Sequence, residues 1–550
     1  MPRFVTKLIL VLGVPAGLLA QLPAISPHGI KNAASFQPVG LPSGSLARGS
    51  IFTIFGSAMG PQQGVQVSAF PLQNKFSGVS ITVTQGTTVV NALPLYVRQD
   101  QINAVMPSNA PLGWASLQVV FNNAFSNPSP VYIVNDSVGI FSSTGTGIGP
   151  GAIHNFVSTS NQPGNSATTS AKPGQVVTLF ATGLGPITTP DNQAPPTGTL
   201  PTPVELWVGG IPATVSYSGR SPCCSGLDQV AFTVPANAPT GCWVPVEIRT
   251  SHATVSNFVS MAINPKGAEC LDASNPLSAA VVQGGSTGIL SLSRMTIHED
   301  QGVAAAIDLT TDFVKYSATK QAGGPFAFVP WVSTPPPGSC TVYPGVSDFM
   351  DTGAVPADNT LTSGLSAGKQ LTISGQSGKQ VVSFQNGASS VLGSLLPLYS
   401  FPNRLVLQPG AYTVSSDGGT DVAAVQASIT VPNPVTWTNR DTTTNVIRSQ
   451  PLTVSWSGGG NNQSMALMGV SSDLPSSSSA IFFCMGSPGA ASITVPPEVL
   501  SALPATEPDV MASKSVIYLM QSQTGTISAK GLATALSSMV YMMGKTVVFQ

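Results

Sequence analysis

Apolar and polar residues alternate along most of the chain with the period of a β-strand. Val230, Phe232 and Val234, for example, alternate with polar or small residues, so that one set of side chains would face a core. Such runs are short, rich in Val, Ile, Thr and Phe, and separated by Gly, Pro, Asn and Ser. Long helical patterns are scarce, and one short helix is expected at residues 497–503. The pattern predicts an all-β protein.

One stretch of the chain occurs twice. Residues 100–113 read DQINAVMPSNAPLG and residues 228–241 read DQVAFTVPANAPTG, at a constant offset of 128. Two more pairs follow the same order: residues 49–61 with 174–186, at an offset of 125, and Ser126-Asn127 with Ser256-Asn257, at an offset of 130. Matched segments in one order indicate two copies of a module. Each copy has room for about seven short strands, which predicts tandem immunoglobulin-like β-sandwiches.

The two copies differ in phase after the repeated stretch. Leu117 and Val119 mark the apolar face in the first copy, whereas Val244 and Val246 mark it in the second, one residue out of register under the offset of 128. A β-bulge in one copy would reconcile the two faces. The Asp-Gln pair that opens each stretch has no neighbouring base or metal ligand, so we expect it to satisfy backbone groups at the start of a strand.

The repeated segments also carry a family resemblance. The pattern G-x-x-[IV]-x-[IL]-F-G-[ST]-x-[LM]-G-P, followed by motifs within residues 72–83 and 95–107, resembles the Solibacter uncharacterised C-terminal domain family of exported acidobacterial proteins. In the second copy, residues 182–186 and 228–235 carry it. That family is similar to IPT/TIG immunoglobulin-like modules. The resemblance covers about residues 30–265 and implies a secreted or surface pair of β-sandwiches without an assigned activity or functional residues. The family usually closes its proteins, whereas here residues 266–550 follow.

Composition narrows the possible functions. The chain has 550 residues, too many for one core, and 42% of them are hydrophobic. Only 8% are charged, the net charge is −1, and no basic stripe is present, so binding to nucleic acid or to an anionic membrane surface has no electrostatic basis. No motif calls for a cofactor or a metal. We expect a non-enzymatic protein.

The N-terminus has the pattern of an export signal. Arg3 and Lys7 precede an apolar run over residues 8–20, which is too short to span a bilayer comfortably. We expect a signal peptide over residues 1–20, cleaved after Ala20, and no transmembrane segment after its removal. The protein would then be secreted or held on the outer cell surface.

The expected domain organisation follows from these segments. A leader over residues 21–43 precedes β-sandwich repeats over 44–140 and 141–265. A linker over 266–285 leads to further β-sandwich domains over 286–433 and 434–550, divided near the Pro-Asn-Pro at 432–434.

Six cysteines fit an exported protein. Their spacing lacks the paired Cys-x-x-Cys of a zinc site. We expect two disulfides among Cys223, Cys224, Cys242 and Cys270, with three possible connectivities, and a third bridge between Cys340 and Cys484.

Candidate chemistry is sparse. His298-Glu299-Asp300 is the densest ionisable cluster and would be the best site for an extracellular hydrolase with its site in the C-terminal half, although a solvated turn explains it more simply. Aromatic side chains could stack on sugars, and the tryptophans considered for this role are Trp207, Trp243 and Trp331.

These observations lead to one preferred interpretation. We expect a non-catalytic exported β-sandwich protein that acts in cell-surface interaction or adhesion, or as an extracellular structural module. The alternative is an extracellular carbohydrate-binding protein, and a hydrolase is a third hypothesis. The partner would be an extracellular protein or a polysaccharide of unknown identity.

Overall fold

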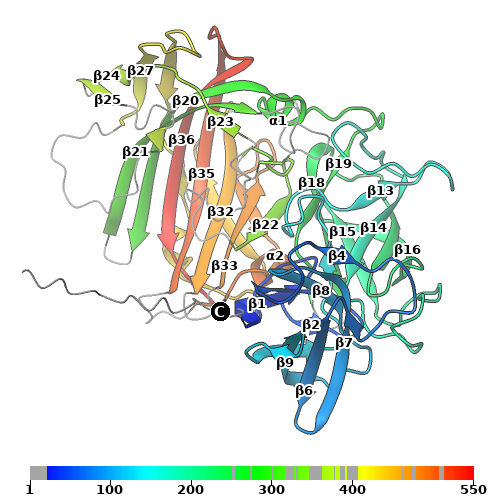
Figure 1. The fold of residues 1–550 in the computed structure, drawn as a ribbon. Coiled ribbons are helices and arrows are strands. Elements are labelled where there is room, and N and C mark those ends of the chain that lie inside the picture. The colour runs from blue at the N-terminus through cyan, green and yellow to red at the C-terminus, as the bar shows by residue number, and fades with distance from the viewer. Residues whose placement is uncertain are drawn as a thin grey trace, which may run out of the picture.

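The computed structural model is all-β, which confirms the predicted fold class. It describes residues 22–250, 254–272, 275–299, 302–316, 328–329, 332–345, 362–376, 378–383, 391–392, 407–460, 462–473, 478–506 and 513–550. Two similar sandwiches, drawn in blue to green, lie beside one long sheet that is green, orange and red (Figure 1). We call them unit 1, unit 2 and the C-terminal unit.

Unit 1 is a sandwich in which the strands follow the order β1-β3-β8-β7-β6-β9-β11-β2, with three short strands at the sides. Its bounds are β1 (Ala24–Asn32), β2 (Leu46–Ala47), β3 (Ile51–Ser57), β4 (Val65–Gln66), β5 (Lys75–Phe76), β6 (Val79–Gln85), β7 (Thr88–Val97), β8 (Gln101–Val105), β9 (Gly113–Phe121), β10 (Ala124–Phe125) and β11 (Ser129–Val134).

Unit 2 repeats this order as β12-β14-β17-β16-β15-β18-β19. Its bounds are β12 (Gly139–Ile140), β13 (Ile153–Asn155), β14 (Val176–Thr182), β15 (Val204–Val208), β16 (Ile211–Arg220), β17 (Asp228–Thr233), β18 (Gly241–Thr250) and β19 (Val259–Ile263). Seven strands of unit 1 thus have a counterpart in unit 2, in the same neighbour order. In both units the long strand that joins the two sheets, β7 or β16, carries an irregularity in its register.

The predicted bulge is confirmed in the second copy. The register of β18 against β19 shifts between Gly241 and Val244, and Val244 and Val246 then face the core of unit 2. Asp228 has the predicted backbone role, since its carboxylate accepts a hydrogen bond from the Leu184 N–H at 2.9 Å, whereas the Asp100 carboxylate of the first copy accepts hydrogen bonds from the exposed Arg98 side chain. Burial raises the pKa of Asp228 to about 6, against the opposing effects of the Arg220 charge and of the backbone donors.

The repeated Ser-Asn pair ties the two sheets of each sandwich together. The Asn127 amide accepts a hydrogen bond from the Ile25 N–H at 2.8 Å and donates to the Ile25 carbonyl at 3.2 Å. Asn257 does the same at Ile140, at 2.8 and 2.9 Å, and also donates to the Gly147 carbonyl. The asparagine side chain therefore makes the backbone hydrogen bonds that a neighbouring strand would otherwise make to the edge strand, which is β1 in unit 1 and β12 in unit 2.

Residues 24–32 lie in the segment expected to be a leader, yet they form β1 and pair with β3. Ile25 and Ile30 are buried in the core of unit 1, which gives this strand an apolar side to place against the sandwich. In the structure the leader region is therefore part of the first sheet.

The C-terminal unit is built on a sheet in the order β22-β33-β32-β35-β36-β20-β21-β23, with β26 beside β21. Strand β20 runs parallel to β36, so segments from both sides of residues 432–434 share this sheet. Its elements are α1 (Ser278–Gln283), β20 (Gly285–Glu299), β21 (Gly302–Tyr316), β22 (Cys340–Pro344), β23 (Thr362–Gly364), β26 (Val391–Leu392), β32 (Ser464–Asp473), β33 (Ser478–Met485), β35 (Ser513–Ile527) and β36 (Thr534–Thr546).

Two smaller sheets cover one face of this long sheet. Buried Leu467, Ile517 and Leu519 of the long sheet pack against the sheet β29-β31-β34 and the helix α2, and Leu290 and Tyr541 pack against the sheet β25-β24-β27-β28. The helix confirms the one expected near residue 497. The bounds are β24 (Gln370–Gly375), β25 (Gly378–Ser383), β27 (Gly410–Ser416), β28 (Gln426–Val431), β29 (Thr436–Trp437), β30 (Asn445–Val446), β31 (Leu452–Ser457), β34 (Ser492–Val495), α2 (Pro497–Ser501) and β37 (Val548–Phe549), with a short 3-10 helix at Arg440–Thr442.

Partly buried polar bonds join unit 1 to unit 2. The Ile51 N–H donates to the Thr182 hydroxyl at 2.8 Å, and the backbone N–H and hydroxyl of Ser108 donate to the Asp191 carboxylate, each at 2.7 Å. Unit 2 meets the C-terminal unit through apolar contacts, since its Val255 and Phe258 belong to the same buried cluster as the core of that unit, and through an ion pair between Arg249 and Glu498.

Candidate functional site

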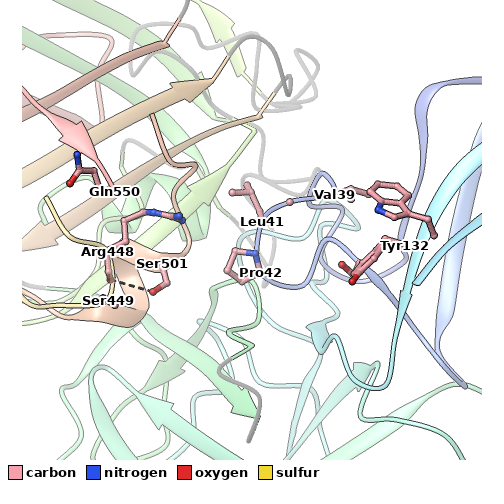
Figure 2. Close-up of a pocket in the computed structure, with 11 residues that line it drawn as sticks. Val39, Leu41, Pro42, Tyr132, Arg448, Ser449, Ser501 and Gln550 are labelled. Carbon is pink, nitrogen blue, oxygen red and sulfur yellow. Dashed lines mark hydrogen bonds between the residues drawn. The ribbon is translucent and has the colours of Figure 1, made fainter. Parts of the chain in front are cut away.

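A groove of about 650 Å³ lies between unit 1 and the C-terminal unit. We call it the aromatic groove. Figure 2 shows Tyr132 on one side of it, the loop of Leu41 and Pro42 in the middle, and polar residues of the C-terminal unit on the other side. Its volume falls within the range of roughly 300–1,000 Å³ that is usual for small-molecule sites.

Trp114 and Tyr132 form the aromatic side of the groove. They are directly opposite each other on the neighbouring strands β9 and β11, and their ring centroids are 5.1 Å apart with the planes tilted by 57°. Trp114 is 61% exposed and Tyr132 is 37% exposed. Strand alternation explains this placement, since Ala115 on β9 and Val131 on β11 face the core and leave their neighbours outside.

The opposite side of the groove is polar. It consists of Arg448, Ser449, Ser501 and Gln550. The Arg448 guanidinium donates to the Leu503 carbonyl at 2.8 Å, and the Arg448 backbone N–H donates to the Gln550 carbonyl at 2.8 Å. Burial lowers the pKa of Arg448. Ser449 and Gln550 are exposed, so hydroxyl and amide groups are presented across the loop of Leu41 and Pro42 from the aromatic pair.

Two of the three tryptophans considered for stacking, Trp207 and Trp243, lie outside the aromatic groove. Trp243 is 3% exposed and packs in a buried cluster with Val281 of α1, so its ring has no accessible face. Trp207 is half-buried, and the Arg249 guanidinium lies 4.3 Å from the centre of its ring. Trp331 lies outside the described residues. The sequence analysis did not select Trp114, although its alternation with buried Ala115 and Leu117 was a usable signal.

A second candidate is a charged cluster between unit 2 and the C-terminal unit. Arg249 bridges two carboxylates, with 3.6 Å to Glu247 on its own strand and 2.5 Å to Glu498 on α2. These groups line a cavity of about 360 Å³ together with Trp207. Glu247 and Glu498 are only 4% and 9% exposed. Burial, and secondarily the Glu498 charge, raises the pKa of Glu247 to about 8 against the attraction of Arg249.

All six cysteines are paired in the structure. Cys340 is bonded to Cys484, the pairing proposed above, and it joins directly opposed residues of β22 and β33. Among the other four, the structure has Cys223 bonded to its neighbour Cys224 and Cys242 bonded to Cys270. The first of these two bridges borders a further cavity of about 850 Å³ between units 1 and 2.

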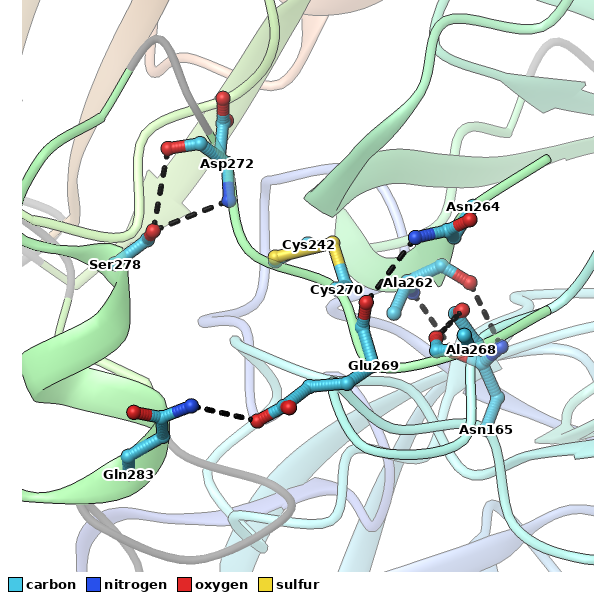
Figure 3. Close-up of a disulfide and its surroundings, with 11 residues drawn as sticks. Asn165, Cys242, Ala262, Asn264, Ala268, Glu269, Cys270, Asp272, Ser278 and Gln283 are labelled. Carbon is cyan, nitrogen blue, oxygen red and sulfur yellow. Dashed lines mark hydrogen bonds between the residues drawn. A yellow bond between two sulfur atoms is a disulfide. The ribbon is translucent and has the colours of Figure 1, made fainter. Parts of the chain in front are cut away.

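The bridge between Cys242 and Cys270 fixes part of the segment that was expected to be a linker. Figure 3 shows it beside a set of hydrogen bonds that reach α1. Gln283 on α1 donates to the Glu269 carboxylate at 2.9 Å, and Ser278 bonds to the backbone of Asp272. The segment after unit 2 is therefore tied to β18 on one side and to α1 on the other.

The best sequence candidate for a hydrolase is only partly described. The His298 ring lies 3.3 Å from the Gly544 carbonyl, and burial lowers the pKa of its imidazole. The side chain of Glu299 and the whole of Asp300 lie outside the described residues. Within the described ranges, no group of three or more His, Cys, Asp and Glu side chains could hold a metal ion. The described helices are too short or too polar to cross a bilayer.

Comparison with known proteins gives only distant similarities. No protein family and no curated protein matches the chain. Among solved structures, domains 5–6 of the S-layer protein SbsC cover 44% of this chain and 98% of their own, with 12% identity and a TM-score of 0.16. Domains 4–9 of the surface layer protein SbsC cover 94% of this chain and 65% of their own, with 10% identity and a TM-score of 0.17.

Immunoglobulin domains 1–5 of Sidekick-1 cover 96% of this chain and 99% of their own, at 9% identity and a TM-score of 0.12. TM-scores this low carry no argument about function. The fold and the sites of this chain are therefore interpreted from its own residues.

Proposed function

We propose that this protein is exported and acts outside the cell as a non-catalytic module for surface interaction or as a structural module. The observation that carries the proposal is the set of hydrogen bonds and apolar contacts that join its three units. Bonds such as that between Ile51 and Thr182 fix unit 1 to unit 2, and the apolar cluster around Phe258 fixes unit 2 to the C-terminal unit. A body held in this way presents its outer surfaces in fixed relative positions, which suits display or assembly.

The chemistry of the chain supports the same proposal. The three disulfides are typical of an oxidising compartment, and the low share of charged residues leaves few groups for acid–base catalysis. The resemblance of residues 30–265 to the Solibacter family of exported proteins and the apolar segment behind Arg3 and Lys7 also support export.

The buried pair Glu247 and Glu498 could suggest a hydrolase, since both carboxylates line one cavity. Both side chains are almost fully buried and both lie against Arg249. When Glu247 is protonated, Arg249 and Glu498 balance each other in charge, and the burial of both carboxylates leaves a substrate little access. We therefore interpret it as an internal contact between two units.

Localisation and retention test the proposal. The full-length gene is expressed in its native host, and antibodies locate the protein in the cytoplasm, the envelope or the medium. The mature protein is then incubated with isolated envelopes and sedimented. We expect it in the medium or on the outer surface, with a fraction that sediments with envelopes. A protein that stays in the cytoplasm would contradict the proposal.

A further inference from the structure

We propose that the aromatic groove binds a single polysaccharide strand, with Trp114 and Tyr132 as the stacking surface and the C-terminal unit as the hydrogen-bonding side. This inference rests on the proposed function outside the cell, and it names the chemical class of the partner.

The aromatic pair has the properties of a binding surface. A tryptophan that is 61% exposed leaves much of a large apolar ring in water, beside a second ring that is 37% exposed. Both rings come from one rigid sandwich, because their strands are directly paired. A pyranose ring has an apolar C–H face and polar edges, so it can cover such a ring while its hydroxyl groups stay hydrated or find partners.

The opposite side supplies those partners. The exposed side chains of Ser449 and Gln550 carry a hydroxyl and an amide, which can both donate and accept hydrogen bonds, as sugar hydroxyl groups do. Among the described residues that line the groove, no side chain is acidic and Arg448 is the only charged one. The charge pattern therefore disfavours a basic peptide and admits a neutral or acidic sugar.

The angle between the Trp114 and Tyr132 rings favours single soluble polysaccharide chains over crystalline polymers. Rings that lie in one plane suit the flat surface of a crystalline polymer, whereas Trp114 and Tyr132 are tilted by 57°. A tilted pair follows the twist of one free chain. We therefore expect binding to soluble polysaccharide chains and much weaker retention on crystalline polymers.

A matched control lies on the same sandwich. Phe125 on β10 is also 61% exposed, but it pairs with Val120 near the far end of β9 from Trp114 and does not line the groove. Trp114→Ala and Phe125→Ala thus remove equally exposed rings from one sheet, and only the first changes the groove. Ser449→Ala tests the polar side without touching the aromatic pair.

The test is affinity electrophoresis of the full mature protein through gels that contain soluble α-glucan, β-glucan, β-mannan, a uronic acid polymer or solubilised peptidoglycan strands. We expect retardation by at least one polymer. Trp114→Ala should weaken that binding at least about tenfold, as removal of a central aromatic contact does. Phe125→Ala should change it less than about twofold, and each variant must show an unchanged melting temperature.

Three results would overturn the inference: no retardation of the wild type by any polymer, equal binding by Trp114→Ala, or binding of a proline-rich peptide to the groove in place of sugar. Added salt separates the ligand classes, because binding to the uronic acid polymer through Arg448 weakens with salt whereas binding to a neutral glycan does not. The localisation experiment stays independent, since an exported protein that binds none of the polymers would refute only this inference.

Discussion

The carboxylate of Glu247 makes the contact between unit 2 and the C-terminal unit sensitive to pH. In the folded protein it lies in the cavity with Glu498 and Arg249, so one positive charge faces two carboxylates. When Glu247 is protonated, Arg249 and Glu498 form a balanced pair. When Glu247 ionises, an additional negative charge is buried, and burial is the main reason why its pKa is raised to about 8.

The magnitude follows from the difference between the folded and unfolded pKa values. A rise from 4.5 to about 8 corresponds to at most about 5 kcal/mol, at about 1.36 kcal/mol per unit. Between these values the folded state binds more protons than the unfolded state, so the free energy of unfolding decreases as the pH rises. The stabilisation is complete below pH 4.5 and is lost by about pH 8.

Glu247→Gln keeps the shape of the side chain and removes its ionisation. We expect the variant to equal the wild type near pH 5 and to be more stable near pH 8 by about 2–5 kcal/mol. Urea unfolding of both proteins across this pH range measures the difference. Glu269→Gln, an exposed position outside this cluster, is the control. Parallel pH curves for Glu247→Gln and the wild type would refute the reasoning.

Three further predictions concern stability. Asn257→Ala should destabilise unit 2 by about 3 kcal/mol and Asn127→Ala should destabilise unit 1 by about 1 kcal/mol, because Asn257 is fully buried whereas Asn127 is exposed; thermal unfolding compares them. Replacing both Cys340 and Cys484 by alanine should lower the free energy of unfolding by about 5 kcal/mol, because the bridge closes a loop of sequence separation 144. A reducing agent should lower the melting temperature of the wild type more than that of this variant. Thr182→Val should leave the Ile51 N–H without its acceptor and lower the free energy of unfolding by about 2 kcal/mol. Proteolysis between units 1 and 2 should become faster in this variant, whereas Thr182→Ser should behave as the wild type.

Local patterns predicted the repeated units well. Strand alternation placed Val230 and Val244 in the core, and the phase difference between the copies predicted a bulge in one of them, which the structure has near the start of β18. The matched Ser-Asn pairs proved to be equivalent residues, Asn127 and Asn257, with the same bonds to an edge strand. These features could be predicted because each depends on residues that are close in the sequence or repeated at a fixed offset.

Features that depend on distant segments could not be predicted. Trp243 was considered as a stacking residue, but it is buried in a cluster with Val281 of α1. Trp114 and Tyr132 become a pair only through the register of β9 and β11, and Arg448 comes to the same groove from the C-terminal unit. Alternation shows that a side chain points out of a sheet, but it does not show which segment of the chain faces it.

The parallel pairing of β20 with β36 has a consequence for the order in which the protein can be assembled. Gly288 pairs with Ala535, which follows it by 535 − 288 = 247 residues. Units 1 and 2 are complete once residue 263 has been made, but β20 must wait for its neighbour through roughly 10–50 seconds of ribosomal synthesis. During that interval β20 can be joined by β21 alone, and its other edge is open to foreign strands. A cell that makes this protein would therefore need a holding chaperone for the nascent second half more than for the first.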